Sequence, residues 1–272
     1  MHTDPLLPSP AGELSPGASA LGFRAGEIGT HTSRTIMFDD AATLFASCPR
    51  DASRAEYRES IMSANCLGKR TLSTRRASDQ RLGELYALDP TVPLFRVMRT
   101  LWESDDRGRP LLALLLAAAR DPLLRFSAEP ILSGTPGEQI PRQRFTTAVS
   151  RATGARFNED ILDKIVRNAG SSWTQSGHLE GRSHKVRCLV SPTPHVVAYA
   201  LFEGFILGAR GQALFQTFPA RLLDAPASRL VDLAQDAKRL GLLDLKVAGD
   251  VIEITFPTLL TEEERRIAYG KN

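Results

Sequence analysis

Four side chains with metal-binding chemistry lie close together late in the chain: His178, His184, Cys188 and His195. Imidazole and thiolate groups bind zinc well, but zinc sites use ligands at characteristic short spacings, and these four residues match none of them. No pair of acidic ligands joins the group, and two of the four fall where a β-hairpin is expected. We therefore expect surface histidines near a strand, with no metal and no cofactor.

Sequence motifs for nucleotide binding and hydrolysis are missing. The chain has no GxxxxGK[ST] loop, no GxSxG elbow and no HExxH helix. Gly204 and Gly208 lie in an apolar stretch, where they favour helix packing. The acidic pairs Asp39-Asp40 and Asp105-Asp106 fall at an expected helix start and in a turn, which explains them locally. We expect a protein that is not an enzyme.

Positive charge is concentrated in two segments. The net charge is only +3, yet residues 50–81 and residues 142–187 each carry about twice as many basic as acidic side chains. The rest of the chain is therefore net acidic. Basic charge gathered on compact helical segments indicates a polyanion partner, although solvated helix faces are the simpler explanation of any charge run.

The second basic segment has the pattern of a winged helix-turn-helix. Residues 144–151 predict a first helix, and apolar residues from Ile161 to Ala169 recur at helical spacing in a second, with Asn158 as its cap. Gly177 stops that helix, and two short strands around residues 179 and 185–190 flank a turn at residues 182–184. Hydroxyl, amide and basic groups here predict DNA contacts; the candidates are Arg167, Ser171, Ser172, Thr174, Gln175, Arg182, Lys185 and Arg187. We expect Trp173 in the core.

The first basic segment predicts a helix-turn-helix. A helix over residues 55–63, a turn at residues 65–68 and a second helix to about residue 88 match that motif. The second helix would turn its polar side chains outward towards DNA; the candidates are Lys69, Arg70, Arg75, Arg76 and Gln80. The alternative is a helical hairpin whose surface happens to be basic.

The whole chain predicts a mainly α protein with small β-hairpins, a helical bundle carrying helix-turn-helix and winged-helix units. Residues 93–126 and 194–218 read as apolar core helices, and residues 220–256 repeat the order helix, glycine, hairpin. The expected divisions are a disordered arm (1–33), a helical domain (34–130), a winged unit (142–192), a helix with a second winged unit (193–258) and a final helix and tail (259–272). Residues 129–141 would be a loop at a domain boundary.

The cellular setting is also suggested by composition. Three unpaired cysteines without regular spacing favour a reducing cytoplasm. The start of the chain lacks the pattern of a signal peptide. Residues 111–119 are too short to cross a membrane, and Glu203 interrupts the longer apolar run at residues 196–209. We expect a cytoplasmic protein with no membrane partner.

Two stretches resemble the BrxA family of bacterial BREX phage-defence systems: NCLGKRTLSTRR and NAGSSWTQSGHLEGRSHKVR. The resemblance extends over about residues 34–256. It implies a small, mostly helical, non-enzymatic protein with winged-helix character that binds DNA beside a methyltransferase and other defence proteins. Carried over by position, the phosphate contacts would be Lys69, Arg70, Arg75 and Arg76, with Arg182, Lys185 and Arg187 in the wing. The proline-rich N-terminus departs from the family pattern.

Three functions remain open at this point. The first is a DNA-binding accessory protein of a phage-defence system, whose affinity for double-stranded DNA should fall with salt at a log–log slope of roughly −4 to −5 if about four to six phosphates are contacted. The second is a scaffold that docks partner proteins of the defence complex. The third is a winged-helix transcription regulator, which would need a ligand pocket between the apolar helices of residues 93–126 and 194–209.

Overall fold

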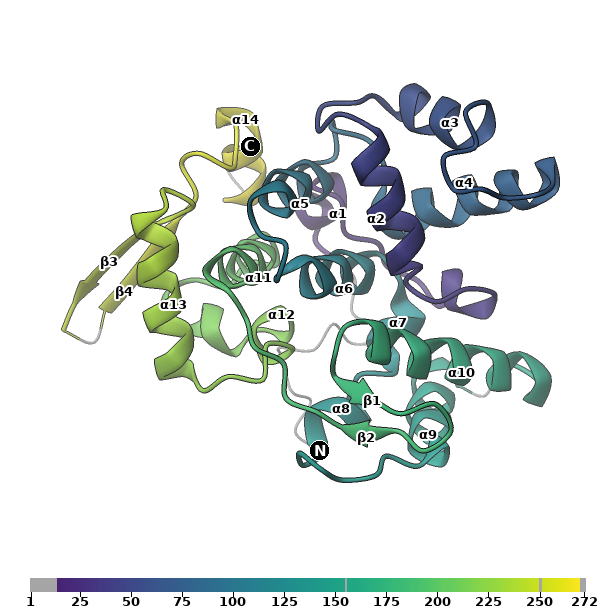
Figure 1. Cartoon of the computed structure of the whole chain (residues 1–272). Helices are drawn as coiled ribbons and strands as arrows, with labels where there is room; N and C mark the ends of the chain where they lie inside the picture. The colour runs from purple at the N-terminus through teal and green to yellow at the C-terminus, as the bar shows by residue number, and fades with distance from the viewer. Residues whose placement is uncertain (1–13, 155, 250, 270–272) are drawn as a thin grey trace.

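The computed structural model describes residues 14–154, 156–249 and 251–269, and this part of the chain is mostly helical with two small antiparallel β-hairpins (Figure 1). The predicted class of a mainly α protein with small β-hairpins is confirmed. The elements of the first half are α1 (Pro16–Ala20), η1 (Thr30–Thr32), α2 (Phe38–Ser47), α3 (Arg54–Met62), α4 (Leu72–Tyr86), α5 (Pro93–Ser104), α6 (Arg109–Arg120), α7 (Pro122–Phe126) and α8 (Glu129–Ser133). Those of the second half are α9 (Arg142–Thr153), α10 (Glu159–Gln175), β1 (Leu179–Glu180), β2 (Val186–Arg187), α11 (Pro194–Ile206), η2 (Gly211–Gln216), α12 (Phe218–Arg221), α13 (Ala227–Arg239), β3 (Asp244–Ala248), β4 (Val251–Thr255) and α14 (Glu262–Ala268).

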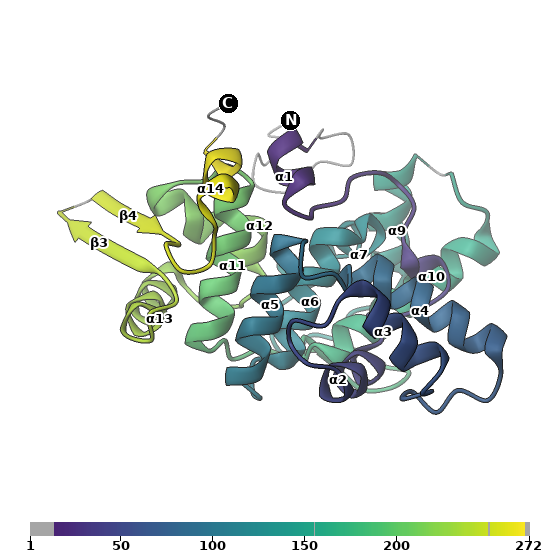
Figure 2. The same ribbon diagram turned by 90° about the horizontal axis from the view of Figure 1, so that it is seen from above.

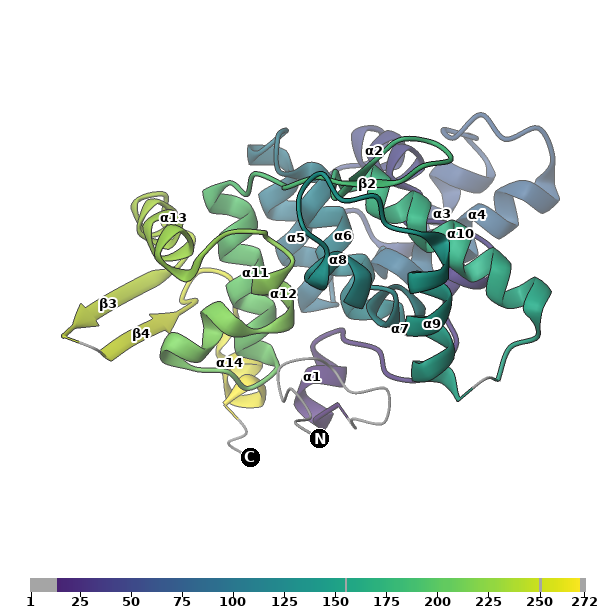
Figure 3. The ribbon, with the colours of Figure 1, turned by 90° about the horizontal axis from the view of Figure 1, so that it is seen from below.

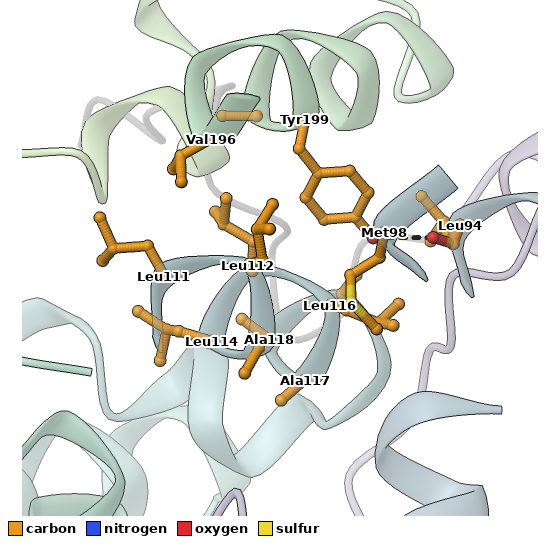
Figure 4. Packing of buried hydrophobic residues seen from close by; sticks show 14 of the residues in the cluster. Leu94, Met98, Leu111, Leu112, Leu114, Leu116, Ala117, Ala118, Val196 and Tyr199 are labelled. Atoms are coloured by element: carbon orange, nitrogen blue, oxygen red, sulfur yellow. Dashed lines mark hydrogen bonds between the residues drawn. The ribbon is translucent and has the colours of Figure 1, made fainter. Parts of the chain in front are cut away.

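Helices α5, α6 and α11 form the centre of the molecule. Every residue from Leu111 to Ala119 in α6 is buried, so this helix is apolar on all sides because neighbours cover all of it. Figure 4 shows α6 packing against α5 and α11, where the Tyr199 hydroxyl donates a hydrogen bond to the Leu94 carbonyl at 3.0 Å. The alternative of a transcription regulator would require its ligand pocket in this interface. None of the described helices is long and apolar enough to span a membrane.

Helices α3 and α4 pack against each other at one end of the molecule (Figures 1 and 2). A capping box starts α3, because the Ser53 hydroxyl accepts from the Glu56 amide and the Glu56 carboxylate accepts from the Ser53 amide. The Thr71 hydroxyl caps α4 by accepting from the Thr74 amide at 3.1 Å. The two helices therefore begin and end close to the predicted positions.

The order α9, α10, β1, β2 also matches the prediction. The Asn158 side chain caps α10 by accepting from the Ile161 amide at 2.9 Å, and Gly177 follows the helix with a φ of 86° that favours glycine. Strands β1 and β2 are shorter than expected, with only two residues each. The segment before α9 pairs with the other side of β2, since the Ile140 amide donates to the Lys185 carbonyl at 2.8 Å.

A second hairpin extends from the opposite end of the molecule. Strands β3 and β4 pair over five residues each, after α13 has ended at Arg239 and Gly241 has turned the chain with a φ of 72°. The hairpin lies far from α10 in all three overall views (Figures 1, 2 and 3). Its order of helix, glycine and hairpin is the one predicted for residues 220–256.

Residues 14–33 do not form the disordered arm that the sequence predicts. Leu21 and His31 are fully buried and Phe23 is nearly so, and α1 and η1 lie within this segment. The prediction was wrong here because a few anchoring side chains, without helical or strand periodicity, are enough to fix a segment on a folded body. Residues 1–13 of the predicted arm lie outside the described residues. The predicted loop at residues 129–141 also begins with a short helix, α8.

Candidate nucleic-acid interface

A cavity of about 330 Å³ opens where α9, α10 and the β1–β2 turn meet. It has an apolar base and a polar, positively charged rim. The base is formed by Ile140, Phe145, Val166 and Gly170, and the rim by Arg142, Arg167, Ser171, Arg182, Ser183 and Lys185. Four of the predicted DNA-contacting residues, namely Arg167, Ser171, Arg182 and Lys185, therefore converge on one site.

Local structure explains why these side chains meet. Val166 and Gly170 occupy successive turns of α10, as do Arg167 and Ser171, so each pair lies on the same side of the helix. The β1–β2 turn brings Arg182 and Lys185 across from them, and the start of α9 supplies Arg142. Helix α10 packs against both α9 and β1, and Figure 1 shows these elements grouped together.

The rim keeps a positive charge after its ion pairs are considered. Arg142 pairs with Asp163, and Arg167 approaches the same carboxylate at 3.7 Å. These side chains are about half exposed, and exposed pairs of this kind contribute only about 0–1 kcal/mol, so a phosphate can compete for the guanidinium groups. Arg182 is exposed and has no ion-pair or hydrogen-bond partner within the described residues.

Lys185 is held over the cavity by neighbours. Its ammonium donates to the Thr174 hydroxyl and to the Gly181 carbonyl, both at 2.8 Å. Partial burial lowers the pKa of Lys185, because desolvation disfavours the charged form. A bound phosphate would stabilise the charged ammonium in place of the water that burial has removed.

Two predicted contacts serve the structure of α10 instead. The Thr174 hydroxyl donates to the Gly170 carbonyl at 3.0 Å while it accepts from Lys185. The Gln175 amide accepts from the Phe38 backbone at 3.1 Å and donates to the Thr35 hydroxyl at 3.1 Å. Neither side chain is among those that line the cavity.

The prediction for Ser172 was wrong, since this residue is fully buried. Its hydroxyl accepts from the Ile36 amide at 2.9 Å and is hydrogen-bonded to His31 Nε2 at 2.8 Å, while His31 Nδ1 lies 2.8 Å from the Asp121 carboxylate. This Ser–His–Asp series has the order of a hydrolase triad. All three residues are buried, however, so a substrate has no access, and the network instead fixes residues 29–36 to α7 and α10. Nothing in the sequence spacing indicates the network.

Trp173 is fully buried, as predicted, and its indole donates to the Ser127 hydroxyl at 2.9 Å. Arg187, by contrast, was wrongly predicted as a wing contact with DNA. It is 3% exposed, forms a bidentate ion pair with Asp224 and donates to the Ile131 carbonyl at 2.9 Å. Successive side chains of a strand point to opposite faces, and Arg187 lies on the face of β2 that packs against the interior, beside Asp224.

In the first basic segment, several predicted contacts are engaged within the protein. Lys69 pairs with Asp40 at 2.7 Å. Arg75 does not point outward as predicted, but donates to the Met62 carbonyl at 3.0 Å and so closes the turn between α3 and α4. Gln80 is exposed and donates to Glu84 at 3.0 Å. Arg70 and Arg76 are exposed, and the structure records no partner for either within its described part.

The four candidate metal ligands do not form a common site, although the Cys188 amide donates to the His178 carbonyl at 2.9 Å, and the expectation of surface histidines was wrong for His178. Both ring nitrogens of the buried His178 are hydrogen-bonded, one to the Ser176 hydroxyl and one to the Leu222 carbonyl, each at 2.8 Å. His184 lies exposed in the β1–β2 turn, with its Nδ1 3.2 Å from the Gln139 amide. Among residues 14–154, 156–249 and 251–269, no three His, Cys, Asp or Glu side chains gather in a geometry that could hold a metal ion.

No protein-family model matches the sequence, and no curated protein matches it significantly. The candidate interface therefore depends on its geometry. Ile140, Phe145 and Gly170 were not singled out in the sequence, and Arg142 was counted only towards the charge of its segment. The only sequence signal for Gly170 is its place in the middle of a predicted helix, where glycine is unfavourable.

Proposed function

We propose that the protein is a non-enzymatic DNA-binding protein that contacts duplex phosphates through the rim residues Arg142, Arg167, Arg182 and Lys185. The observation that supports this most is their convergence from three separate segments on one cavity lined by no carboxylate. Cations gathered in this way neutralise adjacent phosphates and release counterions, which makes the affinity largely independent of sequence.

Electrostatic binding of this kind has a measurable salt dependence. The four rim cations and Lys164, an exposed residue one turn before Arg167, would contact about four or five phosphates if each cation binds one. Each contact contributes about −0.9 to the slope of log affinity against log salt. We expect a slope of roughly −4 for a random-sequence duplex, measured by fluorescence anisotropy at several salt concentrations. A flat response would refute the proposal.

Charge reversal tests whether the rim carries the binding. Arg182→Glu should weaken binding strongly, while Arg229→Glu, the same change on an exposed position of α13, should not. The pair Arg70→Glu and Arg76→Glu tests the α3–α4 unit separately. If Arg182→Glu and Arg229→Glu bind equally well, DNA does not contact the rim.

The resemblance to BrxA supports a role beside other phage-defence proteins. The three cysteines have free thiols, namely Cys48, Cys66 and Cys188. Free thiols fit the reducing cytoplasm, where a phage-defence protein would meet phage DNA. Deleting the gene from a host that carries the defence system should restore phage plaques, and Arg182→Glu should do the same if DNA binding is the relevant activity. Full resistance in the deletion strain would contradict the defence role.

A specific observation favours protein docking as a second candidate function. The β3–β4 hairpin extends from the end of the molecule opposite the cavity and exposes Val247 and Val251, which are 53% and 68% accessible (Figure 2). Exposed apolar side chains on a projecting hairpin are typical of contact surfaces. Capture of defence proteins that survives nuclease treatment and is lost in Val251→Lys would support docking.

A further inference from the structure

The base of the cavity contains Gly170, a glycine within a helix, where this residue type lowers stability. Gly170 lies in the interior of α10, where glycine is less stable than alanine because it loses more backbone freedom on folding. A helix glycine is usually explained by close packing of another segment. Here, a Cβ added at position 170 would have no atom within 4 Å apart from the helix's own nearby backbone, so packing does not account for it. The glycine keeps the cavity open.

The cavity is larger and more apolar than a phosphate needs. A volume of about 330 Å³ lies in the range typical of small-ligand pockets, about 300–1,000 Å³. Ile140, Phe145 and Val166 line its base, although each is 2% exposed and so presents only a small part of its side chain. A bare anion would find no polar partner at this base.

A nucleotide has the matching chemistry: a charged phosphate attached to a flat, largely apolar base. The guanidinium groups of the rim are suited to phosphate and also stack on base planes. The Ser171 hydroxyl donates to the Arg167 carbonyl at 3.0 Å, which leaves its oxygen free to accept from a base edge.

We infer that this cavity binds one unpaired nucleotide, with its phosphate on the arginine rim and its base over Gly170. The inference rests on the proposed DNA binding and deepens it, because it gives the protein a preference for DNA in which a nucleotide is extrahelical. A base enters such a site only when it has left the stack, and unpaired bases do so at the lowest cost.

The test compares a short paired duplex with the same duplex carrying one extrahelical thymidine. Wild-type protein should bind the second roughly 5-fold more tightly, the gain at the low end of what stacking of one base on a side chain supplies. Gly170→Leu fills the cavity and should abolish this preference, measured as the ratio of the variant's affinities for the two DNAs. Gly170→Ala is the smaller change, and should reduce the preference without lowering the melting temperature.

The outcomes separate this inference from the proposed function. Equal affinity of the wild type for the two DNAs, or a preference that both Gly170 variants keep, overturns the nucleotide pocket alone. Failure to bind either DNA, or paired-duplex binding that Arg182→Glu leaves unchanged, overturns the proposed function.

Competition identifies the source of the nucleotide. If thymidine 5′-monophosphate displaces the extrahelical DNA and inorganic phosphate does not, the cavity also accepts free nucleotides. If neither displaces it while the preference remains, the cavity reads a nucleotide within a strand. Equal displacement by inorganic phosphate would show an anion site without base recognition and would overturn the inference.

Discussion

Arg187 and Arg182 lie on the same hairpin and have the same charge, but we predict that replacing each by methionine affects a different property of the protein. Arg187 is 3% exposed and paired with Asp224, which is itself only 7% exposed. Arg182 is exposed at the cavity rim. Arg187→Met should therefore destabilise the fold, whereas Arg182→Met should weaken DNA binding.

The size of the first effect follows from the charge that is left behind. Without Arg187, the Asp224 carboxylate keeps one backbone donor, the Val190 amide at 3.2 Å, and the Ile131 carbonyl loses its side-chain donor. Breaking a buried ion pair on one side costs about 3–5 kcal/mol. At about 2–4 °C per kcal/mol for a chain of this size class, the melting temperature should fall by roughly 6–20 °C.

The second partner provides a check on the cause. Asp224 has a φ of 52°, a conformation that asparagine tolerates well, so Asp224→Asn removes the charge with little backbone strain. Adding it to Arg187→Met should recover about 1–3 kcal/mol, because the stranded charge is gone. Urea unfolding of both single variants and the double variant measures this coupling.

The matched variant, Arg182→Met, should stay within about 0.5 kcal/mol of the wild type in stability. Its salt slope for duplex binding should become less negative by about 0.9, the loss of one phosphate contact. If Arg187→Met instead leaves stability unchanged and reduces the salt slope, Arg187 contacts DNA and our assignment of its role is wrong.

Three further predictions follow from buried polar groups. Ser172→Ala should lower the free energy of unfolding by about 1–3 kcal/mol, because the Ile36 amide and His31 lose a buried partner. Hydrogen exchange of residues 29–36 should become faster, and unchanged exchange would contradict the anchoring role. Burial lowers the pKa of His178 from 6.5 to about 4, so the unfolded chain binds its proton first and stability falls as pH drops from about 6.5 to about 4, by up to about 3 kcal/mol. Urea unfolding of His178→Gln should show this acid-side loss reduced relative to wild type. Burial raises the pKa of Glu203 from 4.5 to about 8, so the neutral acid supports the fold most fully below about pH 4.5, and this contribution is lost as pH rises through about 8. Glu203→Gln should remove that alkaline-side loss. The contributions of His178 and Glu203 change with pH in opposite directions between about pH 4.5 and 6.5. Each is therefore measured as the difference in unfolding free energy between the variant and the wild type.

Residue types and local spacing predicted some of the residues that line the cavity. Arg167, Ser171, Arg182 and Lys185 could be proposed from their types and their place near a helix end and a turn, and they do line one site. The same reasoning included Ser172, which follows Ser171 directly but lies about a hundred degrees further around the helix and faces the interior. The predicted apolar stripe ended at Ala169, one turn too early to mark that face.

In the first basic segment, sequence alone does not show which charged side chains are free to bind DNA. Lys69 and Arg75 are as basic as Arg70 and Arg76, but Asp40 and the Met62 carbonyl, from other elements, engage the first two. Sequence shows that a side chain is charged, while the partner that neutralises it is usually distant along the chain. A net charge counted over a segment therefore overestimates the charge available to DNA.

The elements of this protein were determined largely by the sequence alone: apolar periodicity, caps such as Asn158 and stops such as Gly177 act within a few residues and need no tertiary contact. The tertiary structure decided which polar groups face inward. His31, Asp121 and Ser172 come together from three distant segments, and Arg187 meets Asp224 across 37 positions. Such pairings depend on how the packed elements are oriented, because burial and hydrogen bonding are set by neighbours in space.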